Sequence, residues 1–566
     1  MGLMKWVLAP VVPVLACALP LAAQGTRPGL TPGAQSARAV GPARAGAPAG
    51  ASAITAAEID GALRFLSSDL LEGRAPAARG GRLAAEYIAA ELRAAGLRPG
   101  NDTSYFQEVP IDVVTQQPGS LRAQATGAAT APLRDPEDVV LWAGSAVPAG
   151  GAHAEVVFVG YGARAPEYRW DDFKGMDLKG KILLMLVNDP PALPGEPDLF
   201  GGKAMTYFGR WTYKFEEAER QGAAGAIVIH RTAEASYPWH TVVGSWSTGQ
   251  RMLPRDPTLP PPLGFRGWIT DSAATALLEQ AGLDLEKLRQ QADSRDFRPV
   301  PTGITLDVAF RNTVEHLRSE NVIGAVPGGD PQLKGEAVVY SAHWDHLGIG
   351  PAVNGDSIYN GASDNASGVA DILAVARAAA AGPPAKRAQV FVFVTGEESG
   401  LLGSDYYARH PTVPAGRIAA DLNVDGGNVL GRVRDLNLQG YDKSSLGPAL
   451  ERFIKPMGLR LSPDEHPEAG HFYRSDHFSF ARAGIPALSI GGGHDFVGRP
   501  ADWGKQQEDD FTAHDYHQPS DDYHADWDLS GAVQLSDIVL RFGRELANSP
   551  SMPTWSKGAE FQRPVP

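Results

Sequence analysis

The second half of the chain contains five strand-length, largely apolar runs, and their spacing constrains the fold more than any other feature. The runs cover residues 319–326, 336–341, 389–394, 419–424 and 486–490. A helix is expected over residues 367–380, between the second and third runs. Strands that are apolar on both faces and alternate with helices are typical of a mostly parallel sheet with helices on both sides. The sequence therefore predicts an α/β fold for this half of the chain.

Side chains that commonly bind metal ions follow three of these runs. They are His343 after the second run, Glu397 and Glu398 after the third, and Asp425 after the fourth. Ligands of an open α/β sheet bind beyond the carboxyl ends of its strands, so we expect these residues to lie at one edge of the sheet. Asp364 lies in a glycine-containing loop before the helix, and this loop can point its carboxylate toward the same edge.

Together with a later histidine, these residues provide the ligand types of a zinc site. The candidate metal ligands are His343, Asp364, Glu398, Asp425 and His517. Imidazole and carboxylate ligands without a thiolate favour zinc, with manganese or cobalt as substitutes. Five side chains exceed what one catalytic ion takes, so we expect two Zn²⁺ ions per chain, bridged by one carboxylate and about 3.5–4 Å apart. Such a pair would lower the pKa of a bridging water toward about 7.

The order and flanks of these residues also resemble a known family. The segments are His343-Trp344-Asp345, Asp364-Asn365, Thr395-Gly396-Glu397-Glu398-Ser399-Gly400, Asp425 and Tyr516-His517. They resemble the co-catalytic di-zinc aminopeptidase family, which includes the glutamate carboxypeptidases, over nearly all of residues 54–546. The resemblance implies that one zinc is held by His343 and Asp425. It implies that the other is held by Glu398 and His517, and that Asp364 bridges the two ions.

The resemblance further implies roles for three residues that do not bind metal. Glu397 would be the general base, which takes a proton from the attacking water and delivers it to the leaving amine. Asp345 would hydrogen-bond to His343 and fix its tautomer. Tyr516 would stabilise the oxyanion, a role that other members give to a differently placed tyrosine, for which Tyr473 is available here.

Two further histidines and one aromatic segment lie near these motifs in the sequence. His346 follows His343 by three residues, but the family pattern does not need it as a ligand. His477 is expected to line the pocket wall or to donate a hydrogen bond there. Residues 237–246 are rich in tryptophan and are expected to form a loop that could fold over the cleft.

Residues 151–310 resemble an inserted protease-associated domain, a small β-rich unit that covers or gates a peptidase site. The resemblance lies in Val159-Gly160-Tyr161-Gly162, in Leu178-Lys179-Gly180-Lys181-Ile182 and in Gly222-Ala223-Ala224-Gly225-Ala226. The alternative is an ordinary small α/β domain. The expected organisation is a signal peptide (1–23), a disordered linker (24–53), the N-terminal part of the peptidase domain (54–150), the insert (151–310), the catalytic domain (311–548) and a C-terminal tail (549–566).

An apolar run opens the chain. It covers residues 6–23, follows Lys5 and is interrupted by Pro10, Pro13 and Pro20, which resembles a secretory signal rather than a membrane span. We therefore expect an exported protein, either periplasmic or extracellular. The single cysteine, Cys17, lies in this run, so it is either a lipid-anchor site or is removed with the signal. Removal would leave a mature protein without disulfides or thiol catalysis.

These observations predict an exopeptidase that hydrolyses N-terminal residues from peptides. No arginine cluster adjoins the ligand motifs in the sequence, and because carboxypeptidases use arginines to clamp a substrate carboxylate, this favours an aminopeptidase. The alternatives are a carboxypeptidase of the glutamate carboxypeptidase type, a glutaminyl-cyclase-like acyl transferase and a receptor-like binding module. The net charge of −14 argues against nucleic acid as a partner. The chain has no Gly-x-Ser-x-Gly motif, so serine hydrolase chemistry has little support.

Overall fold

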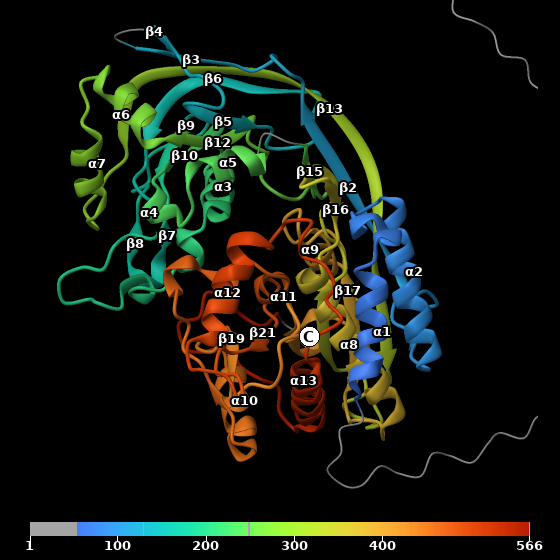
Figure 1. The fold of residues 1–566 in the computed structure, drawn as a ribbon. Coiled ribbons are helices and arrows are strands. Elements are labelled where there is room, and N and C mark those ends of the chain that lie inside the picture. Colours follow the sequence, from blue (N-terminus) through green and yellow to red (C-terminus); the bar gives the residue numbers. More distant parts are fainter. Residues whose placement is uncertain (1–53, 128–129, 247–248, 565–566) are drawn as a thin grey trace, which may run out of the picture. The chain divides into compact units, whose positions relative to one another are not determined.

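A largely parallel central sheet lies in the second half of the chain (Figure 1). The computed structural model describes residues 54–127, 130–246 and 249–564, so the predicted signal peptide and linker lie outside the described residues. Across the central sheet the strands are β2 (Phe106–Gln116), β13 (Val300–Val326), β17 (Ala388–Val394), β14 (Ala337–His343), β18 (Ile418–Asn423), β21 (Ala487–Gly492), β19 (Asp435–Gln439) and β20 (Arg460–Leu461). The four strands from β17 to β21 are parallel, which confirms the predicted sheet.

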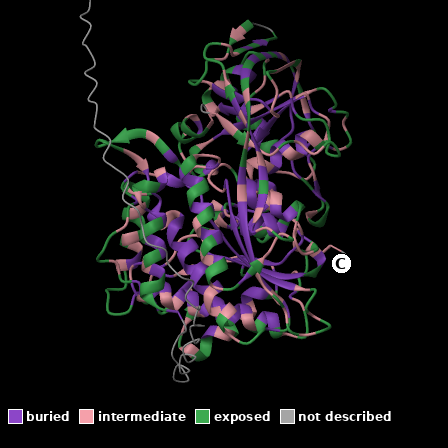
Figure 2. Cartoon of the chain, turned by 90° about the vertical axis from the view of Figure 1, so that its right-hand side faces the viewer, coloured by how far each residue is buried: buried purple, intermediate pink, exposed green. Residues whose placement is uncertain are grey.

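Helices cover both faces of this sheet. One face packs against α1 (Ala56–Leu66), α2 (Arg79–Ala94), α8 (Gly368–Ala381) and α13 (Ser530–Asn548), and the other packs against α9 (Leu402–Arg409) and α11 (His477–Arg482). Successive side chains of a strand point to opposite faces, so Val338 and Tyr340 of β14 join the first core and Val339 joins the second. The strands are therefore buried along their length (Figure 2), which explains why they are apolar without alternation.

A second sheet, here called the inserted sheet, is built from strands that lie between β2 and the second part of β13 in the chain. Its strands, in order, are β4 (Thr130–Pro132), β3 (Arg122–Thr126), the first part of β13, β6 (Ala149–Phe158), β9 (Ile182–Leu186), β10 (Gly225–His230), β12 (Phe265–Thr270) and β5 (Val139–Trp142). Its helices are α3 (Trp211–Arg220), α4 (Thr232–Ala235), α5 (Trp239–Trp246), α6 (Asp271–Glu279) and α7 (Leu285–Ala292). The inserted region is thus a mixture of helices and strands.

One strand, β13, belongs to both sheets. Its first part pairs with β6 and β3, and its second part pairs with β2 and β17. The strand runs without interruption through residue 310, where the sequence places the end of the insert, and β3, β4 and β5 join the inserted sheet although they precede residue 151. The region that shares the inserted sheet therefore begins earlier in the chain than residue 151.

The tryptophan-rich segment forms α5 where a loop was expected. The rings of Trp246 and Trp142 stack at a centroid distance of 4.5 Å and an interplanar angle of 7°, and Trp239 Nε1 donates a hydrogen bond to the carbonyl oxygen of Pro136. The side chains of Trp239 and Trp246 are both half-buried and pack against a core cluster of the inserted sheet. Within the described ranges, no helix is both long enough and apolar enough to cross a membrane.

Candidate metal centre

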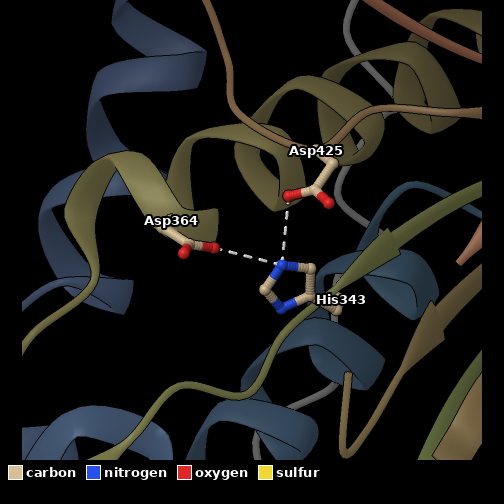
Figure 3. A group of neighbouring side chains, drawn as sticks. All are labelled: His343, Asp364 and Asp425. Carbon is tan, nitrogen blue, oxygen red and sulfur yellow. Dashed lines mark hydrogen bonds and ion pairs between the residues drawn. The ribbon is translucent and has the colours of Figure 1, made fainter. Parts of the chain in front are cut away.

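The predicted metal ligands converge at the carboxyl edge of the central sheet. His343 is the last residue of β14, and Asp425 follows the end of β18 by two residues. His343 Nε2 lies 3.2 Å from Asp364 Oδ1 and 3.2 Å from Asp425 Oδ1 (Figure 3). One imidazole nitrogen cannot direct a single hydrogen atom at two carboxylates, so this arrangement is that of three ligands placed around one cation.

A second group of ligands lies on the other side of Asp364. His517 Nε2 is 3.3 Å from Asp364 Oδ2 and 3.1 Å from Glu398 Oε2. The two carboxylate oxygens of Asp364 therefore face two different imidazoles, as a bridging carboxylate must. His517 adopts a left-handed backbone conformation (φ 60°), which is uncommon for a residue other than glycine and which is concentrated at functional sites.

These distances fit bound zinc. Two ligand atoms that each lie about 2.0–2.1 Å from a tetrahedral zinc ion are about 3.3 Å apart. The four nitrogen–oxygen distances of the cluster are 3.1, 3.2, 3.2 and 3.3 Å. In addition, Glu398 Oε1 and His517 Nε2 are buried, and their close contacts within the cluster lack the geometry of a hydrogen bond. Such atoms are costly unless a cation or water satisfies them, so the donor set and its unsatisfied atoms both suit a metal ion.

His346 belongs to this cluster, although the sequence pattern does not require it. It is fully buried, and its Nδ1 lies 2.6 Å from Glu398 Oε1. Its ligand atom, one from Asp364 and one from Glu398 all lie within 4.8 Å of one another. The only sequence signal is its position three residues after His343, and because the chain after β14 is irregular, that spacing does not fix the direction of the side chain.

Glu397 lies against the same cluster. It offers an oxygen that lies within 4.8 Å of ligand atoms from His343 and Glu398. Its backbone N–H donates a 3.2 Å hydrogen bond to Asp345 Oδ1. The Asp345 carboxylate is 3.9 Å from His343 Nδ1, which instead lies 3.1 Å from the backbone carbonyl oxygen of Asp345. The backbone of Asp345 therefore orients the imidazole, while its carboxylate positions Glu397.

The environment separates the acidities of two carboxyl groups in the cluster. Burial raises the pKa of Glu397 well above its ordinary value, and the charge of His343 only partly offsets this effect. Burial acts in the same direction on Asp364, but the imidazoles of His343 and His517, at 3.2 and 3.3 Å from its two oxygens, hold its pKa well below its ordinary value. Paired carboxyl groups with opposite shifts are typical of a proton acceptor beside a permanently ionised group.

The structure also distinguishes the two candidate tyrosines. The ring of Tyr516 stacks on His517 at a centroid distance of 3.9 Å, the residue is 48% exposed, and its hydroxyl has no hydrogen-bond partner in the described part of the chain. The hydroxyl of Tyr473 is engaged elsewhere, because it donates to Glu560 Oε1 at 3.0 Å and accepts from Lys443 Nζ at 3.0 Å. Of the two tyrosines, only Tyr516 has a free hydroxyl and also packs against a candidate metal ligand, His517. His477 is fully buried, and its ring packs against Phe472.

Arg74 holds two of the ligand-bearing loops in place. Its guanidinium is 1% exposed and donates to the carbonyl oxygens of Trp344 at 2.8 Å, Asn360 at 2.5 Å and Gly361 at 2.8 Å. A fourth hydrogen bond goes to Leu66 at the end of α1. The sequence places Arg74 only in a turn between two helices, because three of its four acceptors are backbone groups about 270–290 residues away.

Asp521 and Asn365 fix the loop that carries the bridging carboxylate. Asp521 accepts hydrogen bonds from the backbone N–H groups of Ser363 at 2.8 Å and Asp364 at 3.0 Å. The side chain of Asn365 donates to the carbonyl oxygen of Val424 at 3.1 Å, one residue before Asp425. The loops that bear the ligands are therefore joined to one another rather than held independently.

Comparison with known proteins agrees with this site. Residues 321–542 match peptidase family M28. A probable leucine aminopeptidase 2 of Aspergillus oryzae is 28% identical over 197 residues, which are 33% of this chain and 36% of that protein. The leucine aminopeptidase 2 of Trichophyton equinum is 26% identical over 293 residues, 48% of this chain and 54% of that protein. The chain thus spans about half or less of the length of the curated relatives it matches.

Two solved structures are similar over most of the chain. The aminopeptidase from Aneurinibacillus sp. strain AM-1 is 19% identical with a TM-score of 0.48, covering 88% of this chain and 95% of that chain. BSAP, a zinc aminopeptidase from Bacillus subtilis, is 19% identical with a TM-score of 0.42, covering 91% and 99%. The matched residues 321–542 include every one of the five predicted ligands. The match to peptidase family M28 therefore covers the part of the chain that carries the candidate metal centre.

Proposed function

We propose that the chain is an exported di-zinc aminopeptidase that removes N-terminal residues from peptides. The proposal rests above all on Asp364, whose two oxygens lie 3.2 and 3.3 Å from the imidazoles of His343 and His517. Each imidazole has a second carboxylate at 3.1–3.2 Å. Two neighbouring ligand sets that share one carboxylate are what a pair of metal ions needs. The relatives that are named leucine aminopeptidases support cleavage at the N-terminal end of the peptide rather than at its C-terminal end.

In this proposal the chain's own residues move the protons. Bound zinc would polarise the peptide carbonyl and make water more acidic. Glu397 accepts a proton from the attacking water at its carboxylate and passes it to the leaving amine. The Asp345 carboxylate keeps Glu397 in position through its 3.2 Å hydrogen bond to the backbone. Tyr516, with its hydroxyl unpaired, donates to the oxygen on which negative charge develops.

The experiment that tests this function combines metal content with substrate choice. Purified protein is analysed for zinc per chain and assayed on leucyl and lysyl peptides with free and with acetylated N-termini. We expect two zinc ions per chain and cleavage of free N-termini only. Efficient cleavage of acetylated peptides would replace the aminopeptidase with a carboxypeptidase. One zinc ion with cyclisation of N-terminal glutamine would favour the acyl transferase alternative.

Export is part of the proposal and is supported by the sequence of the leader alone. Residues 6–23 are apolar, follow Lys5 and are interrupted by prolines, as in a secretory signal. N-terminal sequencing of the protein made in its own host distinguishes the two modes of processing. A new N-terminus after about residue 23 indicates release, a blocked Cys17 indicates lipidation, and an intact Met1 would contradict export.

A further inference from the structure

A buried chain of hydrogen bonds joins the two central strands whose ends carry His343 and Asp425. Ser341 of β14 lies opposite Asn423 of β18, and its hydroxyl oxygen is 3.0 Å from Asn423 Oδ1. Asp421, two residues earlier on β18, places its Oδ1 2.9 Å from the same hydroxyl. All three side chains are at most 1% exposed. Ser341 and Asn423 each precede a candidate metal ligand by two residues, so the chain lies directly beneath the metal centre.

Asn423 extends this chain to the segment before α11. Its Nδ2 donates to the hydroxyl of Ser475 at 3.0 Å and to that of Ser489, on β21, at 3.4 Å. The backbone adds a further link, because the N–H of Val424 donates to the carbonyl oxygen of Ser341 at 2.9 Å. The end of β18 is therefore fixed to β14 on one side and to β21 on the other.

The hydroxyl of Ser341 has one hydrogen atom but two oxygen neighbours. A carboxylate and an amide oxygen both accept hydrogen bonds, and a serine hydroxyl can donate to only one of them. Because Nδ2 of Asn423 is directed at Ser475 and Ser489, the amide oxygen of Asn423 can only accept from Ser341. The contact between Asp421 and Ser341 then needs a hydrogen atom on Asp421. The geometry thus calls for a protonated carboxyl group.

The surroundings of Asp421 also favour its neutral form. In the described part of the chain Ser341 is the hydrogen-bond partner of its Oδ1, while its Oδ2 is buried without a partner. The titratable groups that interact with it are the carboxyl group of Asp476 and the phenol of Tyr407, and neither can supply a positive charge. Burial raises the pKa of Asp421 well above its ordinary value, and Asp476 acts in the same direction. A carboxyl group in such an environment keeps its proton.

We propose that Asp421 is a neutral carboxylic acid that donates its proton to the hydroxyl of Ser341, and that this chain positions the strand ends bearing His343 and Asp425 for metal binding. Asp421 is thus a positioning residue, because it acts through Ser341 and Asn423. A neutral acid can donate a hydrogen bond without adding negative charge beneath a cluster that already contains several carboxylates. The positioning role rests on the function proposed above, whereas the protonation state of Asp421 does not.

Three variants and one control test this proposal. Asp421→Asn keeps the shape of the side chain and a hydrogen-bond donor without a charge, as a protonated carboxyl group does. Asp421→Leu removes the donor, and Ser341→Ala removes the shared hydroxyl. Asp356→Asn, at an exposed position, is the control. The zinc affinity of each folded protein is measured by competition with a chromophoric chelator, and urea unfolding shows how much of each variant is folded.

We expect Asp421→Asn and the control to keep zinc affinity within about threefold of the unmodified protein. Asp421→Leu and Ser341→Ala should weaken it by about 10–100-fold, the usual range for residues that orient metal ligands. A purely structural role would lower stability but leave the zinc affinity of the folded protein unchanged, and that result would overturn the positioning role. A loss in Asp421→Asn as large as that in Asp421→Leu would overturn it as well. If Asp421→Leu does not fold, Ser341→Ala still decides the question.

Infrared spectroscopy tests the protonation state directly. The difference spectrum between the unmodified protein and Asp421→Asn near neutral pH should contain the carbonyl band of a protonated carboxyl group. Carboxylate bands in its place would show that Asp421 is ionised and would overturn the proposal. None of these measurements uses peptide hydrolysis. A protein that passes them but cleaves no peptide would therefore refute the proposed function and not this inference.

Discussion

The central sheet and the inserted sheet both contain parallel strands flanked by helices, but the charges of Lys214 and Asp189 in the inserted region differ in their partners from those of the ligand cluster. In the inserted region, the buried Lys214 donates to the carbonyl oxygens of Tyr161 at 2.6 Å and Asn188 at 2.9 Å. The carboxylate of Asp189 accepts from the backbone N–H and the hydroxyl of Thr206 at 2.7 and 2.6 Å. These charges have hydrogen-bond partners within the protein.

At the edge of the central sheet several buried polar atoms of the ligand cluster lie close to one another without forming a hydrogen bond. Glu398 Oε1 lies 2.6 Å from His346 Nδ1, and His517 Nε2 lies 3.1 Å from Glu398 Oε2, but neither contact has the geometry of a hydrogen bond. Among the described residues, the groups of side chains that could hold a metal ion all lie at this edge of the central sheet. Because unsatisfied buried atoms are costly, they persist where a ligand satisfies them. In this comparison Lys214 and Asp189 are hydrogen-bonded within the protein, whereas the imidazoles and carboxylates at the sheet edge face one another as metal ligands do.

Removing the bridging carboxylate should have the largest effect. Asp364→Asn leaves His343 and His517 without their shared anion, so we expect zinc content to fall below half and activity to fall by about a thousandfold or more. Elemental analysis and peptide hydrolysis measure the two effects. Asp356→Asn, which alters an exposed carboxylate, is the control. Full zinc content in Asp364→Asn would place the metal elsewhere.

The adjacent glutamates should separate metal binding from proton transfer. Glu397→Gln is expected to keep the zinc and to lower kcat by at least about a hundredfold, because the amide cannot accept a proton. Glu398→Gln, one residue later, is expected to lose zinc as well as activity. Near-normal turnover in Glu397→Gln would remove this residue from the role of general base.

The hydrogen-bonded ammonium group of Lys214 in the inserted region should affect the stability of the fold but not zinc binding. Lys214→Met leaves Asp189 and Asp172 without their nearby cation, so we expect the free energy of unfolding to fall by about 3 kcal/mol. Zinc content per folded chain should not change. Urea unfolding measures the first quantity and elemental analysis the second, and Lys203→Met is the exposed control. Loss of zinc in folded Lys214→Met would erase the distinction between the two regions.

A single hydrogen bond in the inserted region should have the smallest effect. Thr206→Val keeps the shape of the side chain but removes the donor to Asp189 Oδ1, which should cost about 1–2 kcal/mol of unfolding free energy. Thr258→Val removes the same kind of bond, to Asp256, at an exposed position and should cost much less. Equal costs at the two sites would mean that burial does not determine the penalty.

The sequence predicts those features that depend on local pattern. The parallel strands follow from apolar runs that are buried on both faces, and the positions of His343 and Asp425 follow from the ends of those strands. The roles of Arg74 and Asp521 could not be predicted, because each acts on backbone groups more than 150 residues away in the chain. A backbone acceptor carries no residue type that a sequence pattern could reveal.

The role expected of Asp345 illustrates the same limit in a different way. The hydrogen bond expected between His343 Nδ1 and the Asp345 carboxylate is replaced by a 3.1 Å contact with the backbone carbonyl oxygen of Asp345, and the carboxylate lies 3.9 Å away.

The burial of Arg74 has a consequence for how the protein responds to acid. Burial lowers the pKa of Arg74 only to about 10, so its guanidinium remains charged throughout the acidic range. The imidazole and carboxylate ligands around it gain protons in that range and release metal ions as they do so. The loops that carry those ligands nevertheless keep their connection to α1. Acid should therefore empty the site without dismantling it, and activity should return when zinc is added at neutral pH.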